Sequence, residues 1–228
     1  MSSAHSSRHI FIGDVHGCLD ELERLLRLAE AGPDDVIVSV GDLVAKGPDS
    51  QGVVALARER GVLSVCGNHD DAVLRYRRAT LAGKEPPDLK RGHVAVAKSL
   101  KEADWRYLEA MPLWLTFPAL NTIVVHAGMV PGLSLAQQKP EDLMTMRVLK
   151  ADGTGSPRLE DGPRWASLWQ GPERVVFGHD ALSGLQMERW AIGLDTGCVY
   201  GHCLTALIVP ERRVVSVDAK RAYRELKT

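Results

Sequence analysis

Long apolar runs, an excess of one charge and secretory features are all missing from this sequence, and each absence excludes a class of protein. The 28 Lys and Arg residues nearly balance the 29 Asp and Glu residues, so the formal net charge is −1. A domain dedicated to nucleic acid would show a basic excess. No apolar run reaches the roughly 18 residues of a membrane span, so no membrane partner is expected. The first residues, Met-Ser-Ser-Ala-His-Ser-Ser-Arg, contain no apolar signal core, which predicts a cytoplasmic protein.

Cysteine and aromatic residues are also scarce. The four cysteines (Cys18, Cys66, Cys198 and Cys203) show no Cys-x-x-Cys spacing, which favours reduced, buried thiols over a disulfide framework or a zinc knuckle. Hydrophobic residues nevertheless make up 45% of the chain, enough at this length to bury a full core. We expect one domain over residues 1–228, with a flexible N-terminus at residues 1–8.

Apolar strands alternate with amphipathic helices in the first third of the chain. The leucines at positions 19, 22, 25, 26 and 28 have helical spacing, and Gly32-Pro33 ends that pattern. Short β-branched runs before and after it end in glycine, which is typical of buried strands. This order predicts a βαβαβ unit with parallel strands, built from strands at 8–12, 36–40 and 62–66 and helices at 18–31 and 50–60.

The rest of the chain predicts a second half with more antiparallel pairing. Residues 70–110 are expected to be helical, with breaks at Gly83 and at Pro86-Pro87. Residues 131–171 have the least regular pattern and predict a surface excursion that contacts substrate. Later strands are expected at 114–117, 122–125, 174–177, 189–192, 204–209 and 214–217. The fold class is therefore α/β, with two packed mixed sheets flanked by helices.

Several predicted strands end in residues that commonly bind metal ions. A lone Asp or Asn before a helix is usually an N-cap, and a lone His after a strand is usually structural. Five strand ends of this kind, each with a neighbouring glycine, are unlikely to be independent accidents. In an open α/β sheet the carboxyl ends of the strands meet at one edge, where ligands bind. The side chains delivered there are Asp14, His16, Asp42, Asn68, His69, His126 and His179.

These motifs, taken in order, resemble the metallophosphoesterase superfamily with its calcineurin-like fold. The first motif, Gly-Asp-Val-His-Gly at 13–17, resembles the phosphoprotein-phosphatase branch. Within that branch the chain is most similar to the ApaH-like phosphatases, relatives of the symmetrical bis(5′-nucleosyl)-tetraphosphatases. That similarity rests on Gly-Asp-Leu-Val-Ala-Lys-Gly-Pro at 41–48, His-Ala-Gly at 126–128, Phe-Gly-His-Asp at 177–180 and Leu-Asp-Thr-Gly-Cys-Val-Tyr-Gly at 194–201. It extends from about residue 10 to residue 210.

The resemblance implies a centre of two divalent metal ions. One ion would take Asp14, His16 and Asp42, and Asp42 would bridge to a second ion. The further ligands of that second ion would be Asn68, His126 and His179. Mixed carboxylate, imidazole and amide donors suit Mn²⁺ best among the candidates, with Fe, Zn²⁺, Co²⁺ or Mg²⁺ as alternatives. Two such ions can clamp a phosphate and activate water for attack.

The same resemblance implies that His69 is the general acid that protonates the leaving oxygen. In the protein phosphatases a Gly-Asp-x-Val-Asp-Arg-Gly motif supplies a second Asp that orients this histidine. This chain has Ala45 and Lys46 in place of that Asp-Arg pair, so no motif residue is available to orient His69. No motif connects His93 with the site.

Three residues are predicted to contact substrate: Lys46, Arg147 and Tyr200. Lys46 would act as a point charge on phosphate. The excursion adds further cations that could hold a polyphosphate chain, namely Lys139, Lys150, Arg158 and Arg164. The expected reaction is hydrolysis of a phosphoanhydride in a dinucleoside polyphosphate, with diadenosine tetraphosphate giving two ADP, or in a capped RNA end. The alternatives are a phosphoprotein phosphatase or polyphosphatase using the same site, and a metal-binding module without turnover.

Overall fold

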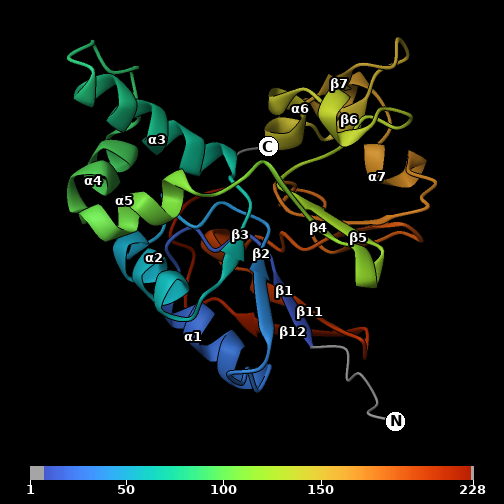
Figure 1. Ribbon diagram of the computed structural model, residues 1–228, viewed down its shortest axis with the longest axis horizontal. Coiled ribbons are helices and arrows are strands. Elements are labelled where there is room, and N and C mark those ends of the chain that lie inside the picture. Colours follow the sequence, from blue (N-terminus) through green and yellow to red (C-terminus); the bar gives the residue numbers. More distant parts are fainter. Residues whose placement is uncertain (1–7, 227–228) are drawn as a thin grey trace.

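Two five-stranded β-sheets lie face to face at the centre of the protein (Figure 1). The computed structural model describes residues 8–226. The expected flexible N-terminus therefore lies outside the described residues except for Arg8, whose guanidinium donates to Asp35 at 2.7 Å. Both sheets mix parallel and antiparallel pairs, as the sequence predicted.

The first sheet has the strand order β12-β11-β1-β2-β3. Its strands are β1 (His9–Ile12), β2 (Val36–Ser39), β3 (Leu63–Ser64), β11 (Cys203–Val209) and β12 (Arg213–Asp218). Strands β1, β2 and β3 run parallel, whereas β11 pairs antiparallel with both β1 and β12. The parallel βαβαβ prediction is confirmed.

The second sheet has the order β4-β5-β8-β10-β9. Its strands are β4 (Trp114–Phe117), β5 (Thr122–Val125), β8 (Arg174–Phe177), β9 (Gln186–Met187) and β10 (Ala191–Gly193). Here β5, β8 and β10 are parallel neighbours. The strands expected late in the chain are therefore divided between the sheets. The run at 203–218 returns to pair with the first strand, which no local pattern could indicate.

Helices cover the outer face of the first sheet and extend beyond its carboxyl edge. The α-helices of this layer are α1 (Leu19–Leu28), α2 (Ser50–Glu59), α3 (Asn68–Leu81), α4 (Arg91–Ser99) and α5 (Glu102–Glu109). As expected, the helical structure is interrupted around Gly83 and Pro86-Pro87, and this segment separates α3 from α4. Short 3₁₀ helices occur at Pro118–Leu120 (η1) and Cys198–Tyr200 (η4).

The alternation of side chains along each strand divides the core into layers. Ile10 and Ile12 face the helices, whereas Phe11 faces the second sheet, as the two-residue period of a strand requires. In β8, Val176 faces the first sheet and Phe177 faces outward. The inter-sheet layer is thus mainly apolar and fixes both sheets as one support for the strand ends.

Residues 131–171 contain more structure than the sequence suggested. They form η2 (Leu135–Gln137), α6 (Pro140–Thr145), β6 (Val148–Leu149), β7 (Gly155–Ser156), η3 (Leu159–Asp161) and α7 (Trp165–Leu168). Trp165 is fully buried: its indole N–H donates to the Ala127 carbonyl at 3.1 Å and its ring packs on Phe177. The segment therefore covers the outer face of the second sheet, in addition to reaching the strand ends.

Two expectations from composition agree with the structure. All four cysteines are free thiols, and three of them are buried. Across residues 8–226, the helices are too short and too polar for any of them to cross a membrane.

Candidate active site

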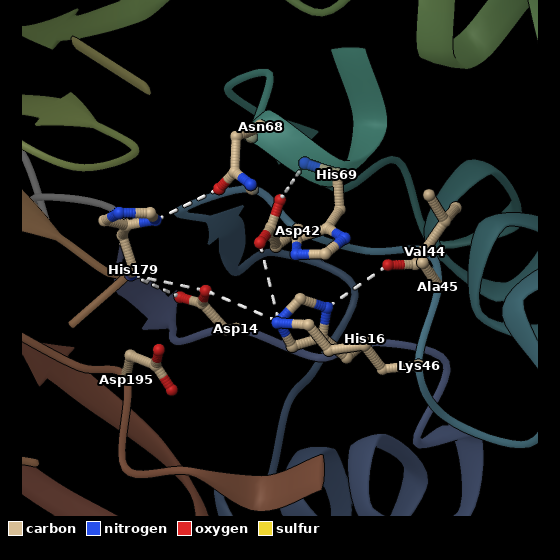
Figure 2. A network of polar contacts seen from close by, with 12 residues as sticks. Asp14, His16, Asp42, Val44, Ala45, Lys46, Asn68, His69, His179 and Asp195 are labelled. Carbon is tan, nitrogen blue, oxygen red and sulfur yellow. Dashed lines mark hydrogen bonds and ion pairs between the residues drawn. The ribbon is translucent and has the colours of Figure 1, made fainter. Parts of the chain in front are cut away.

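A cavity of about 570 Å³ opens at the carboxyl ends of the strands. Loops after β1, β2, β5 and β8, together with the start of α3, bring side chains to this place, and Figure 2 shows most of them converging. Of the predicted site residues, nine line the cavity: Asp14, His16, Asp42, Lys46, Asn68, His69, Arg147, His179 and Tyr200. The remaining one, His126, is wholly buried just behind the cavity wall.

The backbone around this cavity adopts conformations that L-residues rarely occupy. His16, Asp42 and His179 all have positive φ values, of 48°, 52° and 68°. Such conformations cost free energy and persist only where the surrounding structure imposes them. They turn three side chains back toward a common point immediately after their strands end.

Two glycines allow the backbone to approach the carboxylates. A Cβ atom at Gly67 would collide with the Asp42 carboxylate, and one at Gly178 would collide with that of Asp14. Only glycine leaves this space. The glycines that follow β3 and β8 in the sequence thus serve close packing around the two acids.

Asp14, His16 and Asp42 form one cluster of potential ligands. The His16 Nδ1–H donates to the Val44 carbonyl at 3.2 Å, which leaves the lone pair of Nε2 facing the acids. Nε2 lies 3.5 Å from Asp42 Oδ2 and 4.0 Å from Asp14 Oδ2. The backbone N–H of His179 donates to Asp14 at 3.1 Å and fixes that carboxylate.

Asn68, His126 and His179 form a second cluster on the other side of Asp42. His126 Nδ1–H donates to the Val40 carbonyl at 2.8 Å, so its Nε2 carries a lone pair. That lone pair faces Asn68 Oδ1 at 3.1 Å, and His179 Nδ1 faces the same oxygen at 3.0 Å. Asp42 Oδ2 is 3.6 Å from His126 Nε2. Asp42 is therefore the residue shared by both clusters.

Both clusters fit divalent metal ions. A lone pair on His126 Nε2 directed at the Asn68 carbonyl oxygen is unfavourable unless a cation lies between them. The donor set is mixed carboxylate, imidazole and amide, which suits transition metals. Histidine ligands held through their other nitrogen by backbone carbonyls are typical of metal sites.

Burial and neighbouring charges shift the pKa values of the acids and histidines in the two clusters. Burial, followed by the charges of Asp195 and Asp42, raises the pKa of Asp14 well above its usual value. Burial and then Lys46 lower the pKa of His16 well below its usual value. Burial alone would raise the pKa of Asp42, but the positive charges possible on His126, His69 and His16 outweigh it and lower that pKa. Neutral histidines around an ionised Asp42 are the forms that bind a cation.

Asp70 supports the site from beneath, a role the sequence did not reveal. Its carboxylate is fully buried and accepts hydrogen bonds from the backbone N–H groups of Asp42 at 2.8 Å and Gly67 at 3.0 Å. The bond from Gly67 is the N-terminal cap that an Asp at this position predicts, whereas the bond from Asp42 joins α3 to the loop after β2. The signal was its place directly after Asn68-His69 in a motif otherwise assigned to chemistry.

His69 contacts the site and one histidine outside every motif. Its backbone N–H donates to Asp42 Oδ1 at 2.8 Å (Figure 2). Its ring Nδ1 lies 2.8 Å from Nε2 of His93, on α4. Burial lowers the pKa of His69 to about 4 in the absence of bound cations. His93, which the sequence gave no reason to include, thus lines the cavity beside the predicted acid.

The three predicted substrate-binding residues surround the cavity. Lys46 Nζ lies 2.9 Å from His16 Nε2 and 5.2 Å from the centre of the Tyr200 ring. Arg147 donates to the carbonyls of Pro157 at 3.0 Å and His179 at 3.1 Å. Those bonds fix the Arg147 guanidinium against the loop that carries His179.

The remaining cations expected from the excursion do not line the cavity. The lysines and arginines that line the cavity are Lys46, Lys90, Arg91, Arg147 and Arg224. The Arg158 side chain is 70% exposed and pairs with Asp161 instead, and Arg164 pairs with Asp180. The excursion folds onto the second sheet, so only Arg147 reaches the strand ends. Positive charge comes instead from the start of α4 and from Arg224 of the C-terminal segment, which donates to the Lys46 carbonyl at 3.2 Å.

The two-layered mixed sheets and the clusters joined by a shared Asp define a metal-dependent phosphoesterase. The calcineurin-like phosphoesterase family matches residues 7–203. This chain belongs to that family and is a phosphohydrolase, and the family implies divalent metal ions.

Similar proteins carry related names. The chain is 30% identical to bis(5′-nucleosyl)-tetraphosphatase PrpE [asymmetrical] of Oceanobacillus iheyensis, over 93% of this chain and 92% of the relative. It is 35% identical to a symmetrical bis(5′-nucleosyl)-tetraphosphatase of Shewanella oneidensis, over 83% of this chain and 71% of the relative. The crystal structure of a candidate diadenosine tetraphosphatase superposes with a TM-score of 0.84 at 40% identity and covers 95% of each chain.

Proposed function

We propose that this protein hydrolyses a phosphoanhydride bond of dinucleoside polyphosphates, with diadenosine tetraphosphate as the representative substrate. The observation that carries the proposal is the Asp42 carboxylate, shared by two clusters of neutral histidines and oxygen donors at the floor of a cavity with cations around it. The names of the similar proteins support the same substrate class.

Six residues would hold two metal ions: Asp14, His16, Asp42, Asn68, His126 and His179. We infer that Mn²⁺ is the preferred ion. When bound, such a pair supplies Lewis acidity and activates water for in-line attack on phosphorus. The loops with positive φ hold the ligands in place before substrate binds, so little reorganisation is needed during the reaction.

His69 would complete the reaction as the general acid. Its proton passes from Nε2 to the leaving oxygen while the bond to phosphorus breaks. In a phosphoanhydride the leaving group is itself a phosphate oxygen of low basicity. It needs less assistance than the alkoxide of a phosphoserine, which suits a histidine that has no carboxylate partner at position 45.

Lys46, Arg147 and Tyr200 would bind the phosphates next to the reacting one. Lys46 is adjacent to the first cluster, and Arg147 is anchored beside the second. Lys90, Arg91 and Arg224 would extend this charge along the chain of phosphates. Cations on more than one side of the metal ligands support binding of an internal phosphate, with nucleotide on both sides.

That arrangement favours symmetrical cleavage to two ADP. Relatives named as symmetrical and relatives named as asymmetrical tetraphosphatases are both similar to this chain. The experiment is chromatographic analysis of products from diadenosine tetraphosphate in the presence of Mn²⁺, with capped RNA, polyphosphate and a phosphopeptide in parallel. Two ADP support the proposal in full. AMP plus ATP would retain the substrate class and overturn the symmetrical register, and faster phosphopeptide hydrolysis would overturn the substrate class.

A further inference from the structure

His93 makes one directional contact with the predicted acid. His93 lies on α4, is 8% exposed, and brings its Nε2 to 2.8 Å from Nδ1 of His69. The two ring planes differ by only 7° with centres 5.0 Å apart. Near-parallel planes let the N–H of one imidazole point along the ring plane toward the lone pair of the other, as a strong hydrogen bond requires.

The chemistry of a general acid decides which ring donates. A His69 that protonates a leaving oxygen from Nε2 starts as the imidazolium, with a proton on each nitrogen, and ends as the neutral ring with its remaining proton on Nδ1. That Nδ1–H then donates to Nε2 of His93, whose own proton sits on Nδ1. The same hydrogen bond is present before and after proton transfer, so the ring of His69 does not need to turn.

The surroundings of His93 point to this contact as the reason for a histidine there. Its Nδ1 is buried and has no hydrogen-bond partner among residues 8–226. Burying a polar N–H without a partner is unfavourable, and an apolar side chain at this place on α4 would avoid it. Packing alone therefore does not explain His93, whereas a bond to His69 does.

We propose that His93 is the positioning residue of the general acid: it holds the tautomer and orientation of His69 that in other phosphatases would require a carboxylate. This inference rests on the proposed role of His69. Because His93 accepts as a neutral group, it orients the acid without the added electrostatic support of a negative charge. The site is thereby matched to leaving groups of low basicity, such as a nucleoside diphosphate.

Three variants of the full chain, loaded with Mn²⁺, separate positioning from packing. His93→Phe keeps a ring but removes the acceptor nitrogen. His93→Gln places an amide oxygen at a similar reach and restores a neutral acceptor. Val96→Ala is the matched control, because Val96 is a buried core residue of the same helix and its truncation loosens α4 without removing a polar contact.

The measurement compares phenyl phosphate with p-nitrophenyl phosphate, which have similar shapes but leaving groups of different basicity. His93→Phe should lower kcat on phenyl phosphate roughly 10-fold, which is part of the ~10²–10⁴-fold contribution of general acid catalysis, and change kcat on p-nitrophenyl phosphate by less than about 2-fold. His93→Gln should recover most of the loss. Val96→Ala should affect both substrates equally. Equal losses in His93→Phe, or no recovery in His93→Gln, would overturn the inference.

A second measurement does not depend on turnover. Nitrogen-15 NMR of protein loaded with diamagnetic Zn²⁺ reports the tautomer of each histidine. At a pH where the ring of His69 is neutral, the form left after it has donated its proton, we expect the remaining proton on Nδ1 in the wild type and no such preference in His93→Phe. An Nε2–H tautomer of His69 in the wild type would overturn the inference. Absence of any dinucleotide hydrolysis would overturn the proposed function alone.

Discussion

The carboxylate of Asp70 accepts hydrogen bonds from the backbone N–H of Asp42 at 2.8 Å and from that of Val44 at 3.2 Å. A buried acid on α3 thus fixes the loop that carries the shared carboxylate and, through the Val44 carbonyl, the ring of His16. Three backbone donors, counting Gly67, oppose burial and the charge of Asp42, which together raise the pKa of Asp70 well above its usual value.

Asp70→Asn should therefore weaken metal binding, although both Asp70 oxygens accept only from backbone N–H groups and none of the predicted metal-binding atoms is its partner. The amide can accept only through one oxygen and presents an NH₂ group to a backbone donor. Removal of supporting partners typically costs about 10–100-fold in metal affinity or activity. Isothermal titration with Mn²⁺ measures this, with Asp71→Asn as the matched control on the same helix, since Asp71 pairs with Arg75 on the surface. Equal affinities in both variants would contradict the supporting role.

Asp42→Asn should abolish most turnover while leaving the fold intact. A neutral amide bridges two cations poorly, and Asp42 Oδ2 lies 3.5 Å from His16 Nε2 of one cluster and 3.6 Å from His126 Nε2 of the other. We expect kcat to fall by orders of magnitude and elemental analysis to find fewer than two equivalents of Mn²⁺. Circular dichroism should match the wild type, because the residue lies beyond the end of β2 and outside the apolar layers. Near wild-type turnover would rule out a bridging role.

His69→Asn should matter most where the leaving group needs a proton. General acid catalysis is worth about 10²–10⁴-fold, so we expect a loss of that order on phenyl phosphate. The loss on p-nitrophenyl phosphate should be much smaller, because p-nitrophenolate leaves without a proton. The measurement is kcat of the variant and of the wild type on both esters. Identical losses would indicate that His69 acts through binding or structure.

Arg224→Ala should impair long substrates selectively. The Arg224 side chain lines the cavity next to the start of α4 and donates to the Lys46 carbonyl at 3.2 Å, and none of the predicted metal ligands is its hydrogen-bond partner. Loss of one charge contact of ~1.4 kcal/mol corresponds to about 10-fold in KM for diadenosine tetraphosphate. KM for p-nitrophenyl phosphate should stay unchanged, since that ester ends at the reacting phosphate. Arg27→Ala, which removes an exposed charge from α1, is the control. A KM increase on both substrates, or on neither, would contradict this placement.

The metal-ligand cluster could be predicted from the sequence because each member follows its strand directly. Once parallel strands are recognised, Asp14 and Asp42 must meet at one sheet edge. His93 could not be predicted in this way, since it reaches His69 only through the packing of α4 against α3. The positions of Arg158 and Arg164 were also misjudged, because the path of a long loop depends on tertiary contacts such as the burial of Trp165.

The pairing of β11 with β1 shows the same limit for the fold. Each strand is evident from its own residues, but the register of Phe11 with Leu207 joins segments almost at opposite ends of the chain. The local sequence pattern determines where a strand lies and which of its faces is buried. Which sheet the strand joins depends on the apolar layer that its buried face completes. The division of the later strands between two sheets was therefore not visible in the sequence.

The most direct test of the central claim is the ratio of kcat/KM for diadenosine tetraphosphate to that for a phosphoserine peptide, measured with Mn²⁺ and with products identified by chromatography. We predict a ratio above one, with ADP as the sole nucleotide product. A ratio below one, with rapid release of phosphate from the peptide, would contradict the claim.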